Sequence, residues 1–164
     1  WESLVPNNID ATHTMMKAAA EAGVRRFIFA SSVNASLRLD LREQFREEAA
    51  PEPTNLYGAS KVMGEALGSV FAERGDLSVI CLRIGAYQER VPASEWLRPM
   101  WLSPRDFNSI ARLAIEKEGL RYLVVHAVSN NYPLRMSLVR AREVLGYAPE
   151  DNAYAPNVPG TPSP

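Results

Sequence analysis

The sequence predicts an α/β fold in which parallel strands alternate with helices. Three short apolar stretches, 26–31, 77–84 and 121–128, have the composition of buried parallel strands. Segments with helical periodicity lie before and between them, and this alternation with short connections favours right-handed crossovers. The chain has 164 residues, of which 46% are hydrophobic, so it is long enough to build the core of one such domain.

The first two helices are defined by their ends. One is expected from about residue 8 to 22, where Gly23 ends it, and it leads into the strand 26–31. The next contains Tyr57 and runs to about residue 73, ending near Gly75, and the strand 77–84 follows.

The last third of the chain repeats this order. Ser103 is a typical N-cap, Pro104 suits the first helical position and Asp106 completes a capping-box pattern, so a helix should run to about Lys117. The strand 121–128 and a short helix over 134–145 are expected to follow.

Three other features are informative. The stretch 33–55 is long for a plain connection, and loops of that length are usually functional or mobile. Cys81 is the single cysteine and lies within an apolar strand, which is typical of a small buried hydrophobe. Three methionines on the predicted helices are expected to fill the core: Met15, Met16 and Met63.

Composition argues against several classes of function. The net charge is −1, so there is no electrostatic case for a nucleic-acid-binding protein. No run of about 18 apolar residues could span a membrane, and a cytoplasmic location is expected. Neither His13 nor His126 has a carboxylate or cysteine at ligand spacing, so no metal site is expected.

The strongest candidate site combines a tyrosine, a lysine and a serine. Tyr57 and Lys61 are four residues apart on a predicted helix, which places them on one face with Cβ atoms roughly 5–6 Å apart. A nearby ammonium group favours phenolate and brings a phenol towards usable acid/base strength at neutral pH. A Tyr-x-x-x-Lys pair also occurs on solvated helix faces, but Ser32 ends a predicted strand, where open α/β sheets bind ligands.

The spacing of these residues resembles a known family. Four residues fall where the extended short-chain dehydrogenase/reductases, the NAD-dependent epimerases and dehydratases, have their active site: Asn8, Ser32, Tyr57 and Lys61. The resemblance continues to about residue 153. The stretches 82–85, 101–107 and 145–152 are most similar to those of uronate dehydrogenases.

The resemblance implies a carboxyl-terminal part of a longer enzyme. The glycine-rich turn that meets the cofactor pyrophosphate in this family does not occur in the chain. Residues 1–153 are therefore expected to form an incomplete Rossmann-like doubly wound parallel sheet that lacks the amino-terminal glycine-rich βαβ half. The proline-rich tail 154–164 is expected to be disordered.

The resemblance also implies an activity. The parent protein would be an NAD- or NADP-dependent oxidoreductase acting on a sugar or sugar acid, with uronate as one candidate substrate. Tyr57 would exchange the proton of the reacting hydroxyl, Ser32 would orient its oxygen, and Lys61 would favour the phenolate and bind the nicotinamide ribose. Asn8 would hold the helix or a proton-relay water, and Ile84 would contact the cofactor.

The substrate-facing residues are less closely specified. Asn34 lies two positions after Ser32, where it could face the substrate or simply serve as a turn residue. A uronate carboxylate needs a cation, because a guanidinium forms two parallel hydrogen bonds with it. Arg90 and Arg98 lie in the second substrate-facing segment, and for each the alternative is a surface charge.

Two other functions stay open. An epimerase or dehydratase would use the same residues but return the hydride to the substrate. The chain could also be a non-catalytic fragment that cannot bind cofactor, with an exposed sheet edge and apolar surface. In the resembling family, two copies pair through the helices before Ser32 and around Tyr57, so a homodimer is expected.

Overall fold

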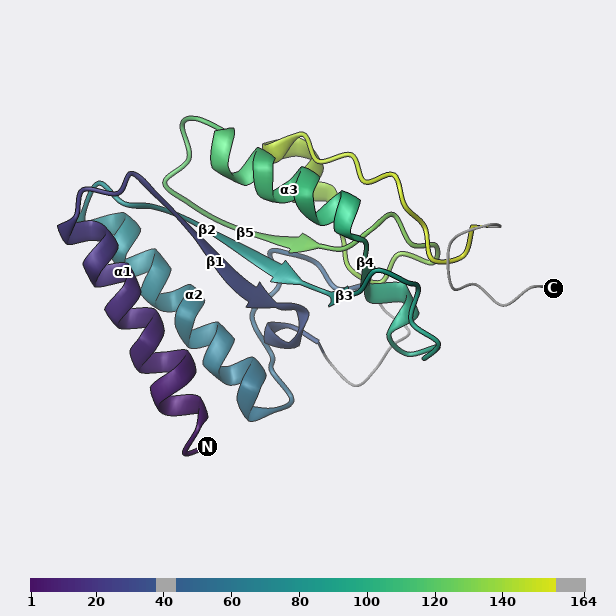
Figure 1. Cartoon of the computed structure of the whole chain (residues 1–164), viewed down its shortest axis with the longest axis horizontal. Helices are drawn as coiled ribbons and strands as arrows, with labels where there is room; N and C mark the ends of the chain where they lie inside the picture. Colours follow the sequence, from purple (N-terminus) through teal and green to yellow (C-terminus); the bar gives the residue numbers. More distant parts are fainter. Residues whose placement is uncertain (38–43, 156–164) are drawn as a thin grey trace.

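The computed structural model describes residues 1–37 and 44–155. Its centre is a parallel three-stranded sheet in the order β1-β2-β5, with helices on both faces (Figure 1). The strands are β1 Arg26–Ser32, β2 Ser78–Ile84 and β5 Tyr122–Ala127, and the helices are α1 Ala11–Glu21, α2 Leu56–Arg74 and α3 Pro104–Glu116. The shorter elements are η1 Val5–Asp10, η2 Val33–Ala35, η3 Arg98–Met100, η4 Ala141–Leu145, β3 Ala86–Tyr87 and β4 Trp101–Leu102.

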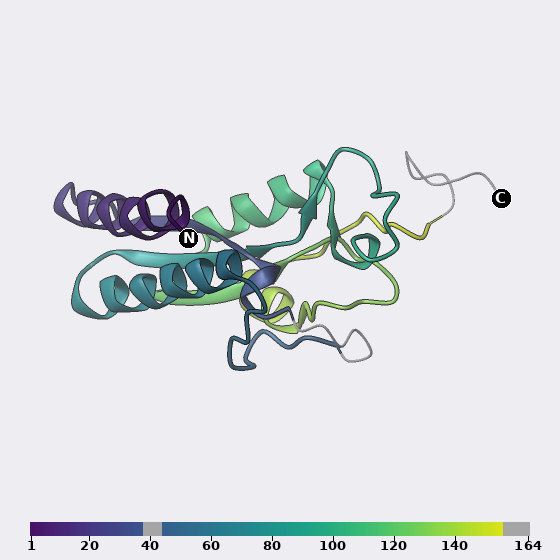
Figure 2. The ribbon, with the colours of Figure 1, turned by 90° about the horizontal axis from the view of Figure 1, so that it is seen from below.

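The helices divide between the two faces of the sheet. α1 and α2 lie side by side on one face, and α3 covers the other (Figures 1 and 2). Successive side chains of a strand point to opposite faces, so each strand contributes to two cores. Ile80 and Leu82 of β2 join the core that includes Ile110 of α3. The alternate residues Val79 and Cys81 join the core on the α1 and α2 side.

The structure tests the expectations for Cys81 and the methionines. Cys81 is fully buried, and burial raises the pKa of its thiol, which confirms the prediction of a buried hydrophobe. Met16 is also fully buried. The expectation was wrong for Met15 and Met63, whose exposed fractions are 60% and 48%, because both lie on the outer sides of their helices.

The predicted helix over 134–145 is shorter than expected. Helical turns begin only at Val139, and residues 134–138 are not helical. The Phe45 N–H donates to the Arg135 carbonyl, and the Ser137 N–H donates to the Phe45 carbonyl, both at 2.8 Å. These bonds form a parallel bridge between Phe45 and Met136. Local periodicity could not reveal this pairing, because its partner lies some ninety residues earlier in the chain.

Part of the long stretch 33–55 is firmly packed. Glu47 is 3% exposed, and its carboxylate accepts hydrogen bonds from the backbone N–H groups of His126, Arg140 and Ala141. One carboxylate thus joins β5 to the start of the last helical segment. The remainder of the stretch, residues 38–43, lies outside the described residues.

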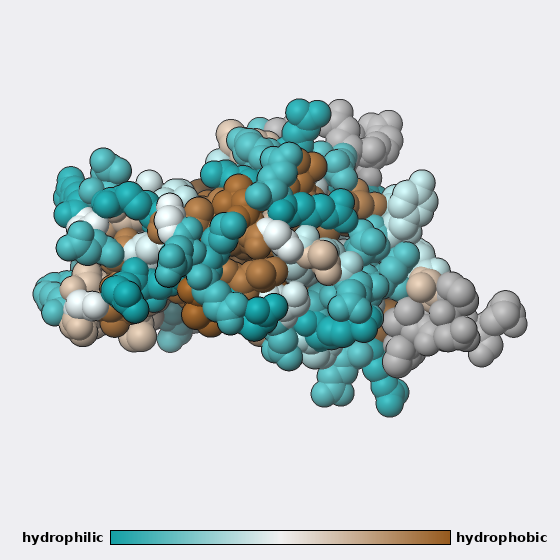
Figure 3. Space-filling model, turned by 90° about the horizontal axis from the view of Figure 1, so that it is seen from above, coloured by the Kyte–Doolittle hydropathy of each residue, from teal (hydrophilic) through white to brown (hydrophobic). Residues whose placement is uncertain are grey.

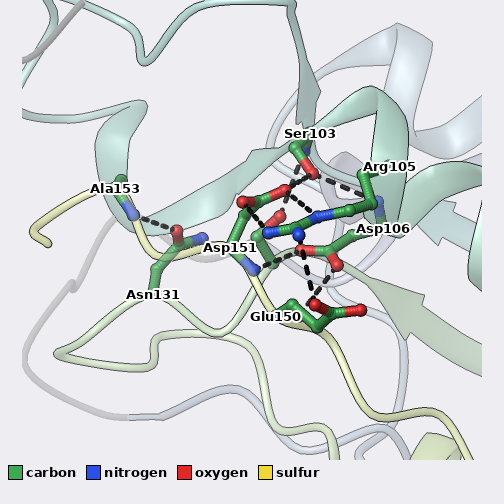
Figure 4. A network of polar contacts seen from close by, with 8 residues as sticks. Ser103, Arg105, Asp106, Asn131, Glu150, Asp151 and Ala153 are labelled. Atoms are coloured by element: carbon green, nitrogen blue, oxygen red, sulfur yellow. Dashed lines mark hydrogen bonds and ion pairs between the residues drawn. The ribbon is translucent and has the colours of Figure 1, made fainter. Parts of the chain in front are cut away.

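The start of α3 confirms the N-cap and corrects the capping box. The Ser103 hydroxyl accepts the Asp106 N–H at 3.1 Å, as predicted. The Asp106 carboxylate does not return the bond, however, and the Ser103 N–H donates instead to the Ser129 hydroxyl at 3.0 Å. Asp106 accepts the N–H groups of Glu150 and Asp151 (Figure 4). A tertiary contact has replaced the local one.

These bonds belong to a wider polar network that fastens the carboxyl-terminal segment (Figure 4). Arg105 pairs with the carboxylates of Glu150 and Asp151, and the Asn131 side chain accepts the Ala153 N–H at 3.0 Å. Burial raises the pKa of Asp151, but the hydrogen bonds from Arg105 and Ser103 outweigh it and the net shift is downward. The chain is therefore held to the sheet as far as residue 153. Residues 156–164 of the predicted disordered tail lie outside the described residues.

Among the residues that the structure describes, β1 pairs with β2 only, so the sheet has an open edge at β1. Apolar residues gather near the middle of the face seen from the α3 side, and hydrophilic residues surround them (Figure 3). Ile115 of α3 is 61% exposed. These features agree with the expectation of an exposed sheet edge and apolar surface. Within 1–37 and 44–155, no helix combines the length and the hydrophobicity needed to cross a membrane.

His126 is a fully buried, neutral histidine. Its Nδ1–H donates to the Ser137 carbonyl at 3.0 Å, and its Nε2 accepts from the Ser36 hydroxyl at 3.4 Å. Burial lowers the pKa of the ring to about 4, and the positive charge of Arg83 adds to this effect. Among the residues that the structure describes, no cluster of side chains could hold a metal ion.

This histidine should make the protein less stable in mild acid. The unfolded chain takes up a proton near pH 6.5 and the folded chain only near pH 4. Over this window the unfolded state binds more protons, so stability falls as pH falls, by about 3 kcal/mol at pH 4. Urea unfolding between pH 7 and 5 should show a weaker pH dependence for His126→Asn. His13→Asn, an exposed control, should behave like the wild type, and equal slopes in all three would contradict the prediction.

Candidate active site

Tyr57 and Lys61 lie together in the first turns of α2. The helix begins where the Asn55 side chain accepts the Gly58 N–H at 2.7 Å. The Lys61 ammonium lies 5.4 Å from the centre of the Tyr57 ring and donates to the Ala30 carbonyl at 3.0 Å. Burial lowers the pKa of Lys61. A partly dehydrated ammonium acts more strongly on its neighbours than one in bulk water.

Ser32 lies at the carboxyl end of β1, in register with Ile84 of β2, which is in turn in register with Ala127 of β5. Its hydroxyl accepts hydrogen bonds from the backbone N–H and the side-chain amide of Asn34, both at 3.2 Å. A serine hydroxyl has two acceptor positions and one donor. Both acceptor positions are used, so the proton of Ser32 is available to a ligand.

Asn34 connects the two parts of the site. Its backbone forms the short turn η2, as the turn interpretation predicted. Its side-chain oxygen accepts from the Asn55 amide at 3.1 Å, and Asn55 caps α2. A chain of side-chain hydrogen bonds thus runs from Ser32 through Asn34 to the helix that carries Tyr57.

Glycines allow α2 to approach the end of β1. A Cβ atom at Gly58 would lie 2.3 Å from the Asn34 carbonyl oxygen. One at Gly64 would lie 2.2 Å from the ring of Phe29 in β1. Both distances are far inside van der Waals contact, so a side chain at Gly58 would have to displace the Asn34 backbone and one at Gly64 would have to displace the Phe29 ring. These helical glycines were a signal in the sequence that local reasoning did not use.

Asn8 reaches the site indirectly. Its side-chain amide donates to the Ser60 hydroxyl at 2.9 Å, and Ser60 donates to the Tyr57 carbonyl at 2.7 Å. Asn8 therefore joins η1 to the first turn of α2. This contact favours the helix-holding role over the proton-relay role that the sequence left open.

A pocket of about 250 Å³ opens beside Ser32 at the carboxyl ends of the strands. Its lining includes Ser32, Asn34, Ile84, Gln88, Trp96 and Leu97. Ile84 and Asn34, both predicted to face cofactor or substrate, thus border the same cavity. Tyr57 does not line it, but is 41% exposed on the adjoining helix.

The two candidate arginines lie elsewhere. Arg98 is held by Glu95, whose carboxylate lies 2.8 Å from the guanidinium, and it stacks 5.8 Å from the centre of the Tyr154 ring. Arg90 is exposed and has no hydrogen bond or ion pair with any residue that the structure describes. Neither side chain lines the pocket beside Ser32.

Sequence reasoning missed a buried ion pair next to the site. Arg83 of β2 forms two hydrogen bonds of 2.8 Å with the Glu65 carboxylate, and both side chains are almost fully buried. The Ser31 hydroxyl also donates to Glu65, at 2.6 Å. Glu65 follows Tyr57 and Lys61 at the same four-residue spacing, so all three lie along one side of α2. A charged residue inside an apolar strand was the available signal.

Comparisons with known proteins agree with this geometry. The model of the NAD dependent epimerase/dehydratase family matches residues 2–87. NAD-dependent glucose-6-phosphate dehydrogenase of Haloferax volcanii is 38% identical over 99% of this chain and 67% of its own length. L-arabinose 1-dehydrogenase (NAD(P)(+)) of the same organism is 32% identical over 93% of this chain and 69% of its own. The crystal structure of uronate dehydrogenase from Agrobacterium tumefaciens has a TM-score of 0.87 at 27% identity.

The chain spans only part of these relatives. It covers 57% of the uronate dehydrogenase structure, while 93% of its own residues are matched. This likeness confirms the predicted fold class, part of a Rossmann-like doubly wound sheet. The family model matches more than half of the chain, and a relative is 38% identical over nearly all of it. The chain therefore belongs to the NAD dependent epimerase/dehydratase family.

Proposed function

We propose that this protein is a nicotinamide-dependent oxidoreductase of the short-chain dehydrogenase type that acts on a sugar or sugar acid. The observation that carries the proposal is the Lys61 ammonium 5.4 Å from the Tyr57 ring, at the same end of the sheet as Ser32. Relatives named as glucose-6-phosphate, L-arabinose and uronate dehydrogenases support the substrate class.

The residues present fit one end of the cofactor. Lys61 uses one N–H on Ala30 and keeps others for a ribose hydroxyl, and Ile84 borders the pocket beside Ser32. The sequence contains no Gly-x-x-Gly-x-x-Gly turn for the pyrophosphate. These residues therefore suit the nicotinamide end of NAD or NADP, and they do not choose between the two.

Each side chain has a task in the reaction. When bound, the nicotinamide supplies hydride transfer. Ser32 donates its free proton to the substrate oxygen and holds that oxygen in place. Tyr57 takes the proton of the substrate hydroxyl at its phenolate Oη, and the Lys61 ammonium lies beside the same ring. Asn8, through Ser60, keeps the first turn of α2 in position.

Turnover by the full chain tests this proposal. With NAD or NADP and a panel of aldoses and uronates, reduced nicotinamide should accumulate, as its near-ultraviolet absorbance reports. Lys61→Met should lower kcat by about 10²-fold or more, since it removes the group that supports proton transfer. Lys17→Met, which removes an exposed lysine of α1, should leave kcat unchanged.

The same assay separates the alternatives. A sugar that changes configuration without net reduction of the cofactor would indicate an epimerase. Calorimetric titration that detects neither NAD nor NADP would contradict catalysis by this chain and support the non-catalytic fragment.

We also propose that two copies pair through α1 and α2. Met15 of α1 and the α2 residues Met63 and Val70 are exposed to 60%, 48% and 46%. Exposed apolar residues on neighbouring helices are typical of interaction surfaces.

A further inference from the structure

We infer that Trp96 is a platform on which the ring of an uncharged monosaccharide stacks inside the pocket beside Ser32. This inference rests on the proposed function, because it names the substrate class of the same site. It differs from the uronate expectation, which required a cation in the pocket.

The chemistry of the pocket walls favours a neutral sugar. Among the residues that the structure describes, the polar side chains that line the pocket are Ser32, Asn34 and Gln88, which are uncharged and can bond with sugar hydroxyls. Trp96 and Leu97 supply apolar surface. A pyranose ring has hydroxyl groups around its edge and C–H groups on its faces, so an aromatic face beside neutral polar groups is complementary to it.

The size of the cavity points the same way. Its volume, about 250 Å³, lies below the roughly 300–1,000 Å³ of pockets that hold drug-sized ligands. A single sugar ring suits such a space better than a nucleotide-linked sugar.

The turn that carries Trp96 is closed by contacts among its own residues. The N–H groups of Leu97 and Arg98 both donate to the Ser94 carbonyl at 3.0 Å. The Arg98 guanidinium pairs with Glu95 within the same turn. Trp96 is nevertheless 43% exposed, so its ring is presented by a fixed backbone rather than packed into the core.

The segments on either side of this turn are fixed as well. The Trp101 indole N–H donates to the Gln88 carbonyl at 2.9 Å. A Cβ atom at Gly85 would lie 2.1 Å from the Met100 carbonyl oxygen, so the segment that follows the turn lies directly on the end of β2. A fixed site loses little conformational freedom on binding.

The charges of the described residues argue against an anionic sugar. Arg83 is paired with Glu65, Arg98 is paired with Glu95, and the Lys61 side chain does not line the pocket. No lysine or arginine of residues 1–37 and 44–155 lines the pocket. A carboxylate or phosphate placed there would lose hydration without gaining a counter-charge from these walls.

Binding of three sugars with the same ring tests the inference. Titration of the full chain with glucose, glucuronate and glucose 6-phosphate, followed by saturation-transfer NMR, should give a Kd for glucose about tenfold or more below the other two. Trp96→Ala should weaken glucose binding by about threefold to tenfold, and Trp96→Phe should restore most of it. Trp1→Ala removes an exposed tryptophan at the start of the chain and should leave the Kd for glucose unchanged.

Three results would overturn it: no detectable glucose binding, charged sugars that bind as tightly as glucose, or an unchanged Kd in Trp96→Ala. The measurement is independent of turnover. A chain that binds glucose through Trp96 but never reduces cofactor would refute the proposed function alone, whereas turnover of uronates with no role for Trp96 would refute this inference alone.

Discussion

Replacing Tyr57 with phenylalanine is expected to lower kcat by about 10²–10⁴-fold. The phenylalanine keeps the ring beside Lys61 but removes the oxygen that accepts the substrate proton. The initial rate of nicotinamide reduction measures the effect. KM should change little, because the phenylalanine keeps the ring and removes only the group that takes the proton during the reaction.

A second tyrosine provides the control for this variant. Tyr132 is 78% exposed in a loop after β5, and Tyr132→Phe removes a hydroxyl that has no hydrogen bond within the described part of the chain. Its kcat should equal that of the wild type. If Tyr57→Phe also turned over normally, the assignment of Tyr57 as the proton carrier would be refuted.

Replacing Glu65 with alanine is expected to lower the free energy of unfolding by about 3–5 kcal/mol. The Arg83 guanidinium would then be left buried without its carboxylate, and one of its nitrogens, Nη1, already has no partner in the described structure. Ser31 would lose its acceptor as well. Urea-induced unfolding at neutral pH, with the slope m compared between variants, measures the loss.

Two further variants distinguish the buried pair from a general effect of charge removal. Glu65→Leu combined with Arg83→Met removes both charges and should recover much of the lost free energy of unfolding. A buried charge is strongly destabilising when it has no partner, and this double variant leaves none. Glu116→Ala breaks an exposed pair with Arg112 on α3 and should have an effect below about 1 kcal/mol. A loss in Glu65→Ala as small as that of Glu116→Ala would show that the buried pair contributes little.

This ion pair also bears on the active site. Glu65 is bonded to Ser31, and Lys61 is bonded to Ala30, so two successive turns of α2 are fastened to the end of β1 that carries Ser32. The position of Tyr57 relative to Ser32 therefore depends on contacts that lie outside the pocket.

The local sequence pattern was sufficient to predict the main helices and strands and the first residues of the candidate site. The limits of β1 and β2 and the end of α2 agree with prediction to within one or two residues, because an apolar run and a helix end are properties of neighbouring residues. The pairing of Tyr57 with Lys61 was predictable for the same reason, since four residues along a helix fix two side chains on one side.

Contacts between distant segments escaped prediction. Met136 pairs with Phe45 rather than entering a helix, and Asp106 binds the backbone at Asp151 rather than capping its own helix. In each case the residue type was compatible with the prediction, and the partner available in three dimensions decided the outcome.

The sequence by itself determined the alternation of strands and helices, the family, and the serine, tyrosine and lysine of the candidate site, because these depend on spacing along the chain. Only the tertiary structure decided which charges are already paired and which side chains line the pocket. The physical reason is that hydrogen bonds and ion pairs form between groups that folding brings together, and the separation of such groups in sequence carries no record of their distance in space.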